Sequence, residues 1–227
     1  MELKNKVVVI TGGTKGIGKA LAISFKNNNA NVVICGDREE EFEDVSNKGI
    51  LAVKADVTKE DELNNLLNII VKKFDHIDLW INNAGVWMPY ASIEDTNWER
   101  AHSLMEVNLF GTIYGSKVSL IQMRKQGFGM IMNILSVRAL GGIAGASAYC
   151  ASKYAANGFT QSLIKEVEGT NIKVISVYPE KIKTNLFDEK RPSNYDDYMD
   201  SSTAAFEIIE NLKKEPPLET LIIKRNK

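Results

Sequence analysis

The chain has few of the residues and patterns that mark several large classes of protein. It has only two cysteines in 227 residues, Cys35 and Cys150, which is too few for a disulfide framework and is typical of packing in a reducing compartment. Its formal net charge is −1, so no basic field predicts binding to nucleic acid. The two histidines, His76 and His102, lack metal-ligand spacing, and we predict no metal site.

Long apolar runs are also missing. No stretch approaches the ~20 apolar residues that a membrane-spanning helix needs, so we expect no membrane association. The first residues lead directly into a short apolar strand, without the apolar stretch and cleavage site of a signal peptide. Together with the cysteine content, these features predict a cytoplasmic protein.

The chain does contain a regular alternation of short apolar strands and longer helical patterns. We predict strands at Lys6–Thr11, Asn31–Cys35, Ile50–Ala55, Leu79–Asn82, Met130–Leu135, Lys173–Val177 and Thr220–Lys224. We predict helices at Ile17–Asn28, Glu39–Ser46, Lys59–Lys73, Asn97–Gln126, Tyr149–Glu168 and Ser202–Lys213. This alternation is typical of βαβ units. It predicts one α/β domain over residues 1–227, with a doubly wound parallel seven-stranded sheet, helices on both faces, and a loosely organised flap at Thr184–Asp200.

A glycine-rich turn follows the first strand, where Thr11–Gly18 reads TGGTKGIG. Glycine permits a tight turn and a close approach of a ligand to the backbone. The helix that follows offers free N–H groups to an anion such as a pyrophosphate. The pattern therefore predicts a dinucleotide site, although a tight turn without a ligand is the alternative when the pattern is taken alone.

Tyr149 and Lys153 are four residues apart in a predicted helix, so their side chains lie on one face. A phenol has a pKa near ~10, and a nearby positive charge is needed to favour its ionised form at neutral pH. Lys153 is a candidate for that charge. The spacing predicts an acid/base pair, although it also arises by chance on solvated helices.

Several motifs in register resemble those of the short-chain dehydrogenase/reductase family. They are the glycine-rich turn, Asn82-Asn83-Ala84-Gly85 after the fourth strand, and Ser136 followed by the Tyr149 and Lys153 pair. Their order and spacing agree from about Leu3 to Thr184. The resemblance implies a Rossmann-type fold. It also implies an oxidoreductase that transfers a hydride between NAD(P)(H) and a small secondary alcohol or ketone.

The resemblance also implies four catalytic residues. Tyr149 would be the general acid/base, and Lys153 would lower its pKa and hydrogen-bond the nicotinamide ribose. Ser136 would hold the substrate oxygen, and Asn108 would anchor a water molecule beside the lysine. Taken singly, Ser136 could instead satisfy a backbone group at a strand end, and Asn108 could be a helix-interior amide bonded to a carbonyl.

By the same resemblance, a dinucleotide would lie against residues from several separate parts of the chain. These are Gly12, Thr14, Lys15, Gly16, Ile17, Gly18, Asp37, Arg38, Asp56, Val57, Asn83, Ala84, Gly85, Tyr149, Lys153, Pro179, Ile182 and Thr184. In this set Asp56 would contact the adenine, but it could equally cap the helix that begins near Lys59.

The end of the second strand bears on the choice between NAD and NADP. An acid there binds the ribose hydroxyls and repels a 2′-phosphate, whereas a basic residue accepts the phosphate. Asp37 lies about 20 residues after the turn, which by itself indicates NAD. Aligned on the family, however, the NAD-selecting acid falls at Gly36, and Lys15 and Arg38 are basic candidates for the phosphate. We therefore predict NADP, with NAD as the alternative.

One position departs from the family pattern. The usual Pro-Gly after the sixth strand is here Pro179-Glu180, which puts a carboxylate beside the expected nicotinamide pocket. The Glu180 side chain would either bind a cationic or polar group of the substrate or turn outward to solvent. We expect the second. The substrate pocket is predicted to include Arg138, Leu140, Trp87, Met88, Ile143, Leu186, Phe187 and Tyr195. Of these, Arg138 either orients an anionic substrate or is a surface charge at the mouth.

Two other functions stay open from the sequence. A dinucleotide-binding redox-sensing or scaffolding protein with little turnover is suggested by Glu180 and the short flap. A nucleotide-sugar epimerase or dehydratase is a further alternative, although such enzymes usually carry an extra C-terminal substrate domain that is not seen here. The helices at Asn97–Gln126 and Tyr149–Glu168 resemble the pair that forms family dimers, so we predict a homodimer or homotetramer.

Overall fold

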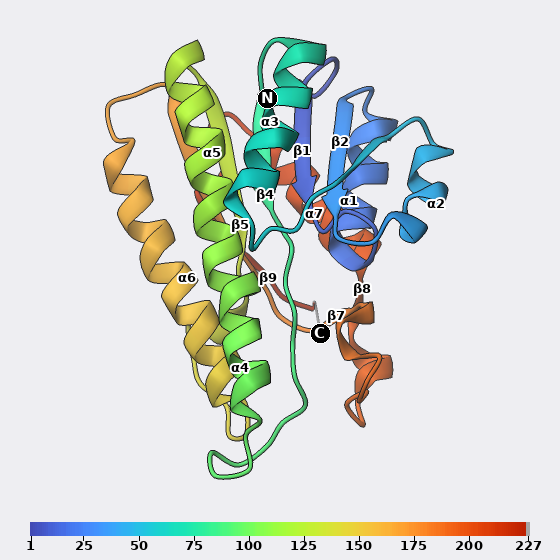
Figure 1. The fold of residues 1–227 in the computed structure, drawn as a ribbon, viewed down its shortest axis with the longest axis vertical. Helices are drawn as coiled ribbons and strands as arrows, with labels where there is room; N and C mark the ends of the chain where they lie inside the picture. The colour runs from blue at the N-terminus through green and yellow to red at the C-terminus, as the bar shows by residue number, and fades with distance from the viewer. Residues whose placement is uncertain (226–227) are drawn as a thin grey trace.

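A parallel seven-stranded sheet lies between two layers of helices in the computed structural model, which describes residues 1–225 (Figure 1). Its strands are β1 (Val7–Thr11), β2 (Asn31–Gly36), β3 (Leu51–Lys54), β4 (Leu79–Asn82), β5 (Gly129–Ile134), β6 (Ile172–Pro179) and β9 (Thr220–Ile223). The strand order is β3-β2-β1-β4-β5-β6-β9, and neighbouring strands are parallel throughout. The predicted doubly wound parallel sheet and single α/β domain are confirmed.

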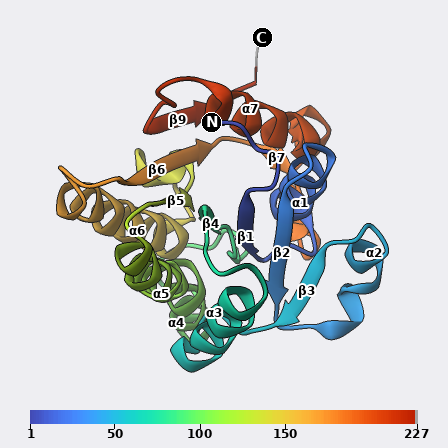
Figure 2. The same cartoon turned by 90° about the horizontal axis from the view of Figure 1, so that it is seen from above.

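Helices cover both faces of the sheet (Figure 2). One face carries α1 (Gly16–Asn27) and α7 (Ser201–Lys213), and the other carries α3 (Glu60–Phe74), α5 (Gly111–Gln126) and α6 (Ser147–Glu166). No helix within residues 1–225 combines the length and apolar character needed to cross a bilayer.

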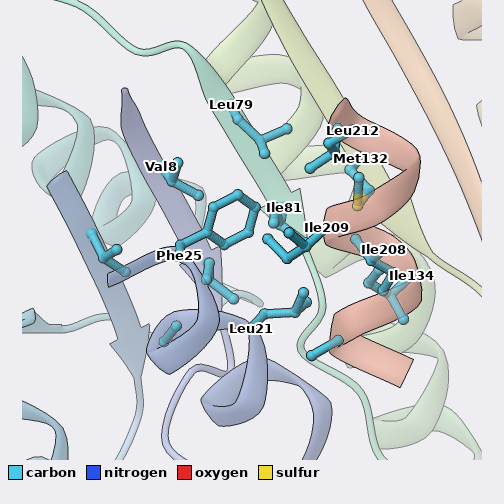
Figure 3. Close-up of a cluster of buried hydrophobic side chains, with 14 of the residues drawn as sticks. Val8, Leu21, Phe25, Leu79, Ile81, Met132, Ile134, Ile208, Ile209 and Leu212 are labelled. Atoms are coloured by element: carbon cyan, nitrogen blue, oxygen red, sulfur yellow. The ribbon is translucent and has the colours of Figure 1, made fainter. Parts of the chain in front are cut away.

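The strands are apolar along their whole length because both of their faces are buried. In β1, Val8 and Ile10 belong to the core against α1 and α7, whereas Val7 and Val9 belong to the core on the opposite face. Successive side chains of a strand alternate between faces, so one short apolar segment supplies both cores. Figure 3 shows the first of these cores, where Phe25 of α1 and Ile209 of α7 lie among side chains of the sheet.

The direction of the strand order reverses next to β1. From β1 the chain runs outward through β2 and β3 on one side, and it then returns to β4 and continues through β5 and β6 on the other. In doubly wound sheets, a crevice forms beyond the carboxyl ends of the strands at such a point. The carboxyl ends of the strands from β1 to β6 carry most of the predicted site residues, and the π-helical turn before α5 and helix α6 (Ser147–Glu166) carry Asn108, Tyr149 and Lys153.

Two predicted helices differ from those in the structure. The predicted helix at Glu39–Ser46 is a 3₁₀ turn at Glu39–Glu41 followed by the four-residue α2 (Glu43–Ser46), in which only Val45 is buried. With so little apolar surface to bury, a longer helix has little packing to stabilise it. The predicted helix at Asn97–Gln126 is divided into α4 (Trp98–Met105), a π-helical turn at Glu106–Phe110, and α5.

The flap is more ordered than the sequence predicted. It contains 3₁₀ turns at Asn185–Phe187 and Tyr195–Asp197, and it ends in β8 (Met199–Asp200). This strand pairs in parallel with β7 (Ile182–Lys183), forming a second, two-stranded sheet. Strands of two residues carry too little periodicity to be seen in a sequence.

Candidate active site

A crevice of about 690 Å³ lies at the carboxyl ends of the central strands. All of the predicted cofactor and catalytic residues line it except Gly18 and Asn108. It is also lined by residues that were not predicted as cofactor or catalytic residues, namely Gly36, Glu41, Ala55, Val86, Trp87, Val107, Ile134, Leu135, Glu180, Asn185, Leu186, Phe187, Asp188 and Glu189. The fold therefore brings motifs from far apart in the sequence into one site.

The glycine-rich turn is held against the turn that follows β4. The hydroxyl of Thr11 accepts hydrogen bonds from the backbone N–H groups of Asn83 and Ala84, both at 3.0 Å. In return, the side-chain amide of Asn83 donates to the carbonyl oxygens of Thr11 and Gly12 at 2.9 and 3.0 Å. These bonds fix the two cofactor-directed turns relative to each other.

Glycine is required in this turn for two reasons. Gly12 has φ +62°, and a Cβ there would lie 2.9 Å from the Cα atom of Ala84. At Gly18 a Cβ would lie 2.2 Å from the carbonyl oxygen of Gly12 and 2.4 Å from the side-chain nitrogen of Asn83. Gly18 is therefore needed for packing behind the turn, and it does not line the crevice.

Within residues 1–225, no side chain caps the N-terminus of α1. The helix begins at Gly16, and Lys15 at its N-cap forms no side-chain hydrogen bond to the first turn. A helix N-terminus of this kind suits a phosphate group because its N–H groups and dipole favour an anion.

Tyr149, Ser136 and Lys153 converge at the other end of the crevice. Ser136 follows β5 by two residues, and its hydroxyl accepts a hydrogen bond from the N–H of Arg138 at 3.1 Å. It also acts on the phenol of Tyr149, whose pKa it lowers. The side-chain nitrogen of Lys153 lies 3.4 Å from the carbonyl oxygen of Ile134 and 6.0 Å from the centroid of the Tyr149 ring. Ser136 thus satisfies a backbone group, as the simpler interpretation predicted, and it also contacts the tyrosine.

Burial is the largest influence on the pKa values of Tyr149 and Lys153. Desolvation by burial raises the pKa of Tyr149 to about 12, although the hydrogen bond with Ser136 and the charge of Arg138 oppose this. Burial also lowers the pKa of Lys153 to about 8. In the protein itself, desolvation outweighs the hydrogen bond with Ser136 and the charge of Arg138. The role of Lys153 in lowering the pKa of the phenol stays a prediction.

Asn108 is fully buried, in the π-helical turn between α4 and α5. Its side-chain oxygen accepts from the N–H of Val86 at 2.8 Å, and its side-chain nitrogen donates to the carbonyl oxygen of Val86 at 3.0 Å and to the hydroxyl of Ser152 at 3.1 Å. The amide does bond to a carbonyl, as the simpler interpretation predicted, but this carbonyl belongs to the loop beside Gly85. Asn108 thereby connects that loop to α6.

Asp56 does not cap the following helix. Its side chain accepts from the N–H and the hydroxyl of Thr58 at 2.9 and 2.8 Å, whereas α3 begins at Glu60 after an N-cap at Lys59 that forms no side-chain bond. Instead, Glu62 in the first turn of α3 accepts from the N–H of Asp56 at 2.8 Å. Asp56 therefore shapes the loop that follows β3, where it lines the crevice.

Glu41 is the candidate site residue that the sequence did not reveal. One of its carboxylate oxygens lies 2.6 Å from the ammonium of Lys15 and 3.6 Å from the guanidinium of Arg38, and the other accepts from the hydroxyl of Thr14 at 2.9 Å. Partial burial opposes ionisation of Glu41, but the hydrogen bonds from Lys15 and Thr14 outweigh it and lower the pKa of the carboxyl. Three glutamates occur in succession at 39–41, and nothing in the sequence says which one faces the glycine-rich turn.

Gly36 leaves room beside this cluster, as expected. A Cβ at Gly36 would lie 3.5 Å from both Phe42 and Thr14, which is ordinary contact. Asp37 is exposed and lines the crevice next to Gly36. The part of the crevice around Gly36 therefore contains both acidic and basic side chains.

An aromatic cluster lies at the substrate end. The ring of Phe187 packs against Trp87, Tyr195 and Tyr198, with centroid separations of 5.1, 6.1 and 5.6 Å, and Trp87 packs against Tyr90 at 5.6 Å. These rings join the flap to the loop after β4. Edge-on aromatic pairs at these distances stabilise such contacts.

Only part of the predicted substrate pocket lines the crevice. Trp87, Leu186 and Phe187 do so, whereas the lining does not include Arg138, Leu140, Met88, Ile143 or Tyr195. Leu140 and Ile143 are exposed, and Met88 is buried against α4. Most of the predicted substrate residues that line the crevice therefore belong to the flap.

Glu180 is exposed at the rim of the crevice. Its backbone N–H donates to the carbonyl oxygen of Ile223 at 3.0 Å, which extends the pairing of β6 with β9. The residue is thus held through its backbone, and it is both exposed and part of the crevice lining.

Comparisons with known proteins agree with this geometry. Residues 6–194 match the family model described as short chain dehydrogenase. An uncharacterized oxidoreductase of Staphylococcus saprophyticus is 35% identical over 192 residues, covering 82% of this chain and 78% of the relative. A second, from Staphylococcus aureus strain MRSA252, is 31% identical over 196 residues, covering 85% and 84%.

Solved structures resemble the chain over nearly its whole length. A short-chain dehydrogenase from Streptomyces avermitilis has a TM-score of 0.86 at 26% identity, covering 98% of this chain and 89% of that one. Levodione reductase has a TM-score of 0.90 at 24% identity, covering 97% and 96%, and bears on the fold alone. Because the family model matches most of the chain and the relatives named above are oxidoreductases with more than 30% identity, this chain belongs to the short-chain dehydrogenase family of oxidoreductases.

Proposed function

We propose that the chain is an NAD(P)(H)-dependent oxidoreductase that interconverts a secondary alcohol and a ketone, with residues 1–227 acting as one dinucleotide-binding domain. The observation that carries the proposal is the convergence of Ser136, Tyr149 and Lys153 at one end of a crevice whose other end is formed by the glycine-rich turn. A hydride carrier and a proton donor are the two components that such a reaction needs.

The crevice suits a dinucleotide in its shape and in its donor groups. The glycine-rich turn, the N-terminus of α1 without a side-chain cap, and Asn83–Gly85 would hold the pyrophosphate and nicotinamide portions. Pro179, Ile182 and Thr184 line the same crevice. When bound, the nicotinamide would supply or accept the hydride.

The protein's own groups would handle the proton. Ser136 would hold the ketone oxygen, and Tyr149 would donate its phenolic proton to that oxygen. Because the pKa of Tyr149 is raised to about 12, the phenol carries its proton at neutral pH, which suits reduction of a ketone. Lys153 would bind the nicotinamide ribose, and Asn108 would position the loop beside Gly85.

We favour NADP(H) as the cofactor. Lys15 and Arg38 lie at the adenosine end of the crevice, where both can approach a 2′-phosphate. Gly36 leaves space at the position where an acid would repel that phosphate. A redox-sensing or scaffolding protein with little turnover is the alternative function.

A cofactor titration followed by a carbonyl panel tests this proposal. We expect NADPH and NADH to bind in a fluorescence titration, with NADPH the tighter of the two, and we expect reduced cofactor to be consumed with at least one ketone. Binding without turnover across a broad panel would favour the alternative, and no binding of either dinucleotide would contradict the function itself.

We also propose that two copies associate through α4, α5 and α6. Members of the family typically form oligomers, and in this chain Phe110 and Ile121 present exposed apolar side chains on that layer. Light scattering at micromolar concentration is expected to give a mass of twice or four times 25.3 kDa. A monomer under those conditions would contradict the proposed assembly.

A further inference from the structure

The carboxylate of Glu41 binds three donor groups at the adenosine end of the crevice. Lys15 and Thr14 belong to the glycine-rich turn, and Arg38 lies just after β2, so the donors come from two separate segments. Both carboxylate oxygens are used. A single acidic side chain therefore holds together the basic groups that the proposed NADP(H) site depends on.

This cluster differs from an ordinary exposed ion pair. The Glu41 side chain is only 19% exposed, whereas those of Lys15 and Arg38 are 47% and 61% exposed. The acid is therefore the inner member, and the two cations lie outside it. Glu41 also lines the crevice itself, so a ligand at this end would meet the carboxylate as well as the cations.

The donors that meet Glu41 are those that a phosphate monoester takes. An ammonium, a guanidinium and a hydroxyl are common partners of phosphate oxygens. In this chain a carboxylate already occupies them, and it carries the same sign of charge as a 2′-phosphate. Binding of NADPH would require Lys15 and Arg38 to be shared with Glu41 or released from it, whereas NADH has no 2′-phosphate to make this demand.

We propose that Glu41 determines cofactor specificity by competing with the 2′-phosphate for Lys15 and Arg38, which reduces the preference of the protein for NADPH over NADH. The inference rests on the proposed dinucleotide-dependent function. We therefore expect the chain to bind NADH with measurable affinity as well as NADPH, and we expect the ratio of the two dissociation constants to depend on Glu41.

The test compares Glu41→Gln with the matched control Glu40→Gln. Glutamine keeps the size of the side chain and removes its charge. Glu40 is the adjacent residue, is exposed, and forms no ion pair within residues 1–225, so its variant makes the same change in net charge without touching the cluster. Dissociation constants for NADPH and NADH are measured by fluorescence titration at low and moderate salt, and melting temperatures show that each variant is folded.

Glu41→Gln is expected to bind NADPH about tenfold more tightly, equivalent to ~1.4 kcal/mol, with little change for NADH. Glu40→Gln should leave the ratio of the two constants near that of the wild type. The gain in NADPH affinity should shrink as salt rises, because screening weakens both the attraction and the competition. An unchanged ratio in Glu41→Gln, or weaker NADPH binding, would overturn the inference.

A double-mutant cycle tests the competition in a second way. Lys15→Met should weaken NADPH binding by a larger factor in the Glu41→Gln background than in the wild type, since Lys15 is fully available to the phosphate only when Glu41 is neutral. Equal factors in the two backgrounds would show no competition. If the wild type binds neither dinucleotide, the proposed function fails, and this result is distinct from two bound cofactors whose ratio Glu41 does not affect.

Discussion

Replacing Tyr149 with phenylalanine is expected to lower kcat for ketone reduction at least ~10²-fold, the usual scale of general acid catalysis, with cofactor affinity nearly unchanged. The substitution removes only the hydroxyl that would protonate the substrate oxygen. The ring stays packed near Met88, Ala101 and Leu104, so the helix should keep its position. Steady-state rates with the best ketone of the panel, together with a cofactor titration, measure the two effects separately.

Tyr154→Phe is the matched control for this prediction. Tyr154 lies on the same helix and is 46% exposed, and the variant loses the same chemical group away from the crevice. We expect its kcat to equal that of the wild type. Full activity in Tyr149→Phe would rule out the proposed proton transfer, and an equal loss in both variants would attribute the effect to damage to the helix.

The repeated, local features of this protein were the ones that the sequence predicted well. Strands buried on both faces, such as β1, read as unbroken apolar segments because the sheet leaves no solvent-facing side. Tyr149 and Lys153 also follow from a local rule, since four residues of helix place two side chains on one face. Both features depend on neighbours in the chain, and both are present in the structure.

Features that depend on distant contacts were not predictable in the same way. Glu41 matters because it meets Lys15, which is separated from it by a whole βα unit, and the two adjacent glutamates look identical in the sequence. The π-helical turn around Asn108 is another example. It places a fully buried amide against the backbone of Val86. No residue pattern within the helix predicts a π-helical turn at this position.

The electrostatics of the site were the least predictable. Sequence spacing indicated that Lys153 stands near Tyr149, but the pKa of a buried group depends on how much water the surrounding chain excludes. Here exclusion of water outweighs the charges, so the pKa of the phenol rises and the pKa of the ammonium falls. The consequence for Lys153 is a cost in stability that can be measured.

Replacing Lys153 with methionine is expected to stabilise the folded protein by ~2 kcal/mol at neutral pH, and to abolish ketone reduction. The lysine is only 5% exposed. Its one side-chain hydrogen bond within residues 1–225 is a long one, at 3.4 Å to the carbonyl oxygen of Ile134. Burial lowers its pKa from 10.5 to about 8, and each unit of such a shift corresponds to ~1.4 kcal/mol. The lost hydrogen bond offsets about 1 kcal/mol of that gain.

The pH dependence gives this prediction its sign. Between about pH 8 and 10.5 the unfolded chain binds more protons at Lys153 than the folded chain does, so the stability of the wild type rises with pH across that window. Below it the cost of burying the charge is fully present. The advantage of Lys153→Met should therefore be largest at neutral pH and should decrease as the pH approaches 10.

Chemical denaturation at neutral pH and near pH 10 measures this difference. Lys165→Met is the control, because Lys165 is exposed on the same helix and such substitutions usually change stability by less than ~0.5 kcal/mol. A wild type more stable than Lys153→Met at neutral pH, or an advantage that grows with pH, would contradict the assigned cost. The expected result would mean that the protein keeps a destabilising buried charge beside Tyr149 because turnover depends on it.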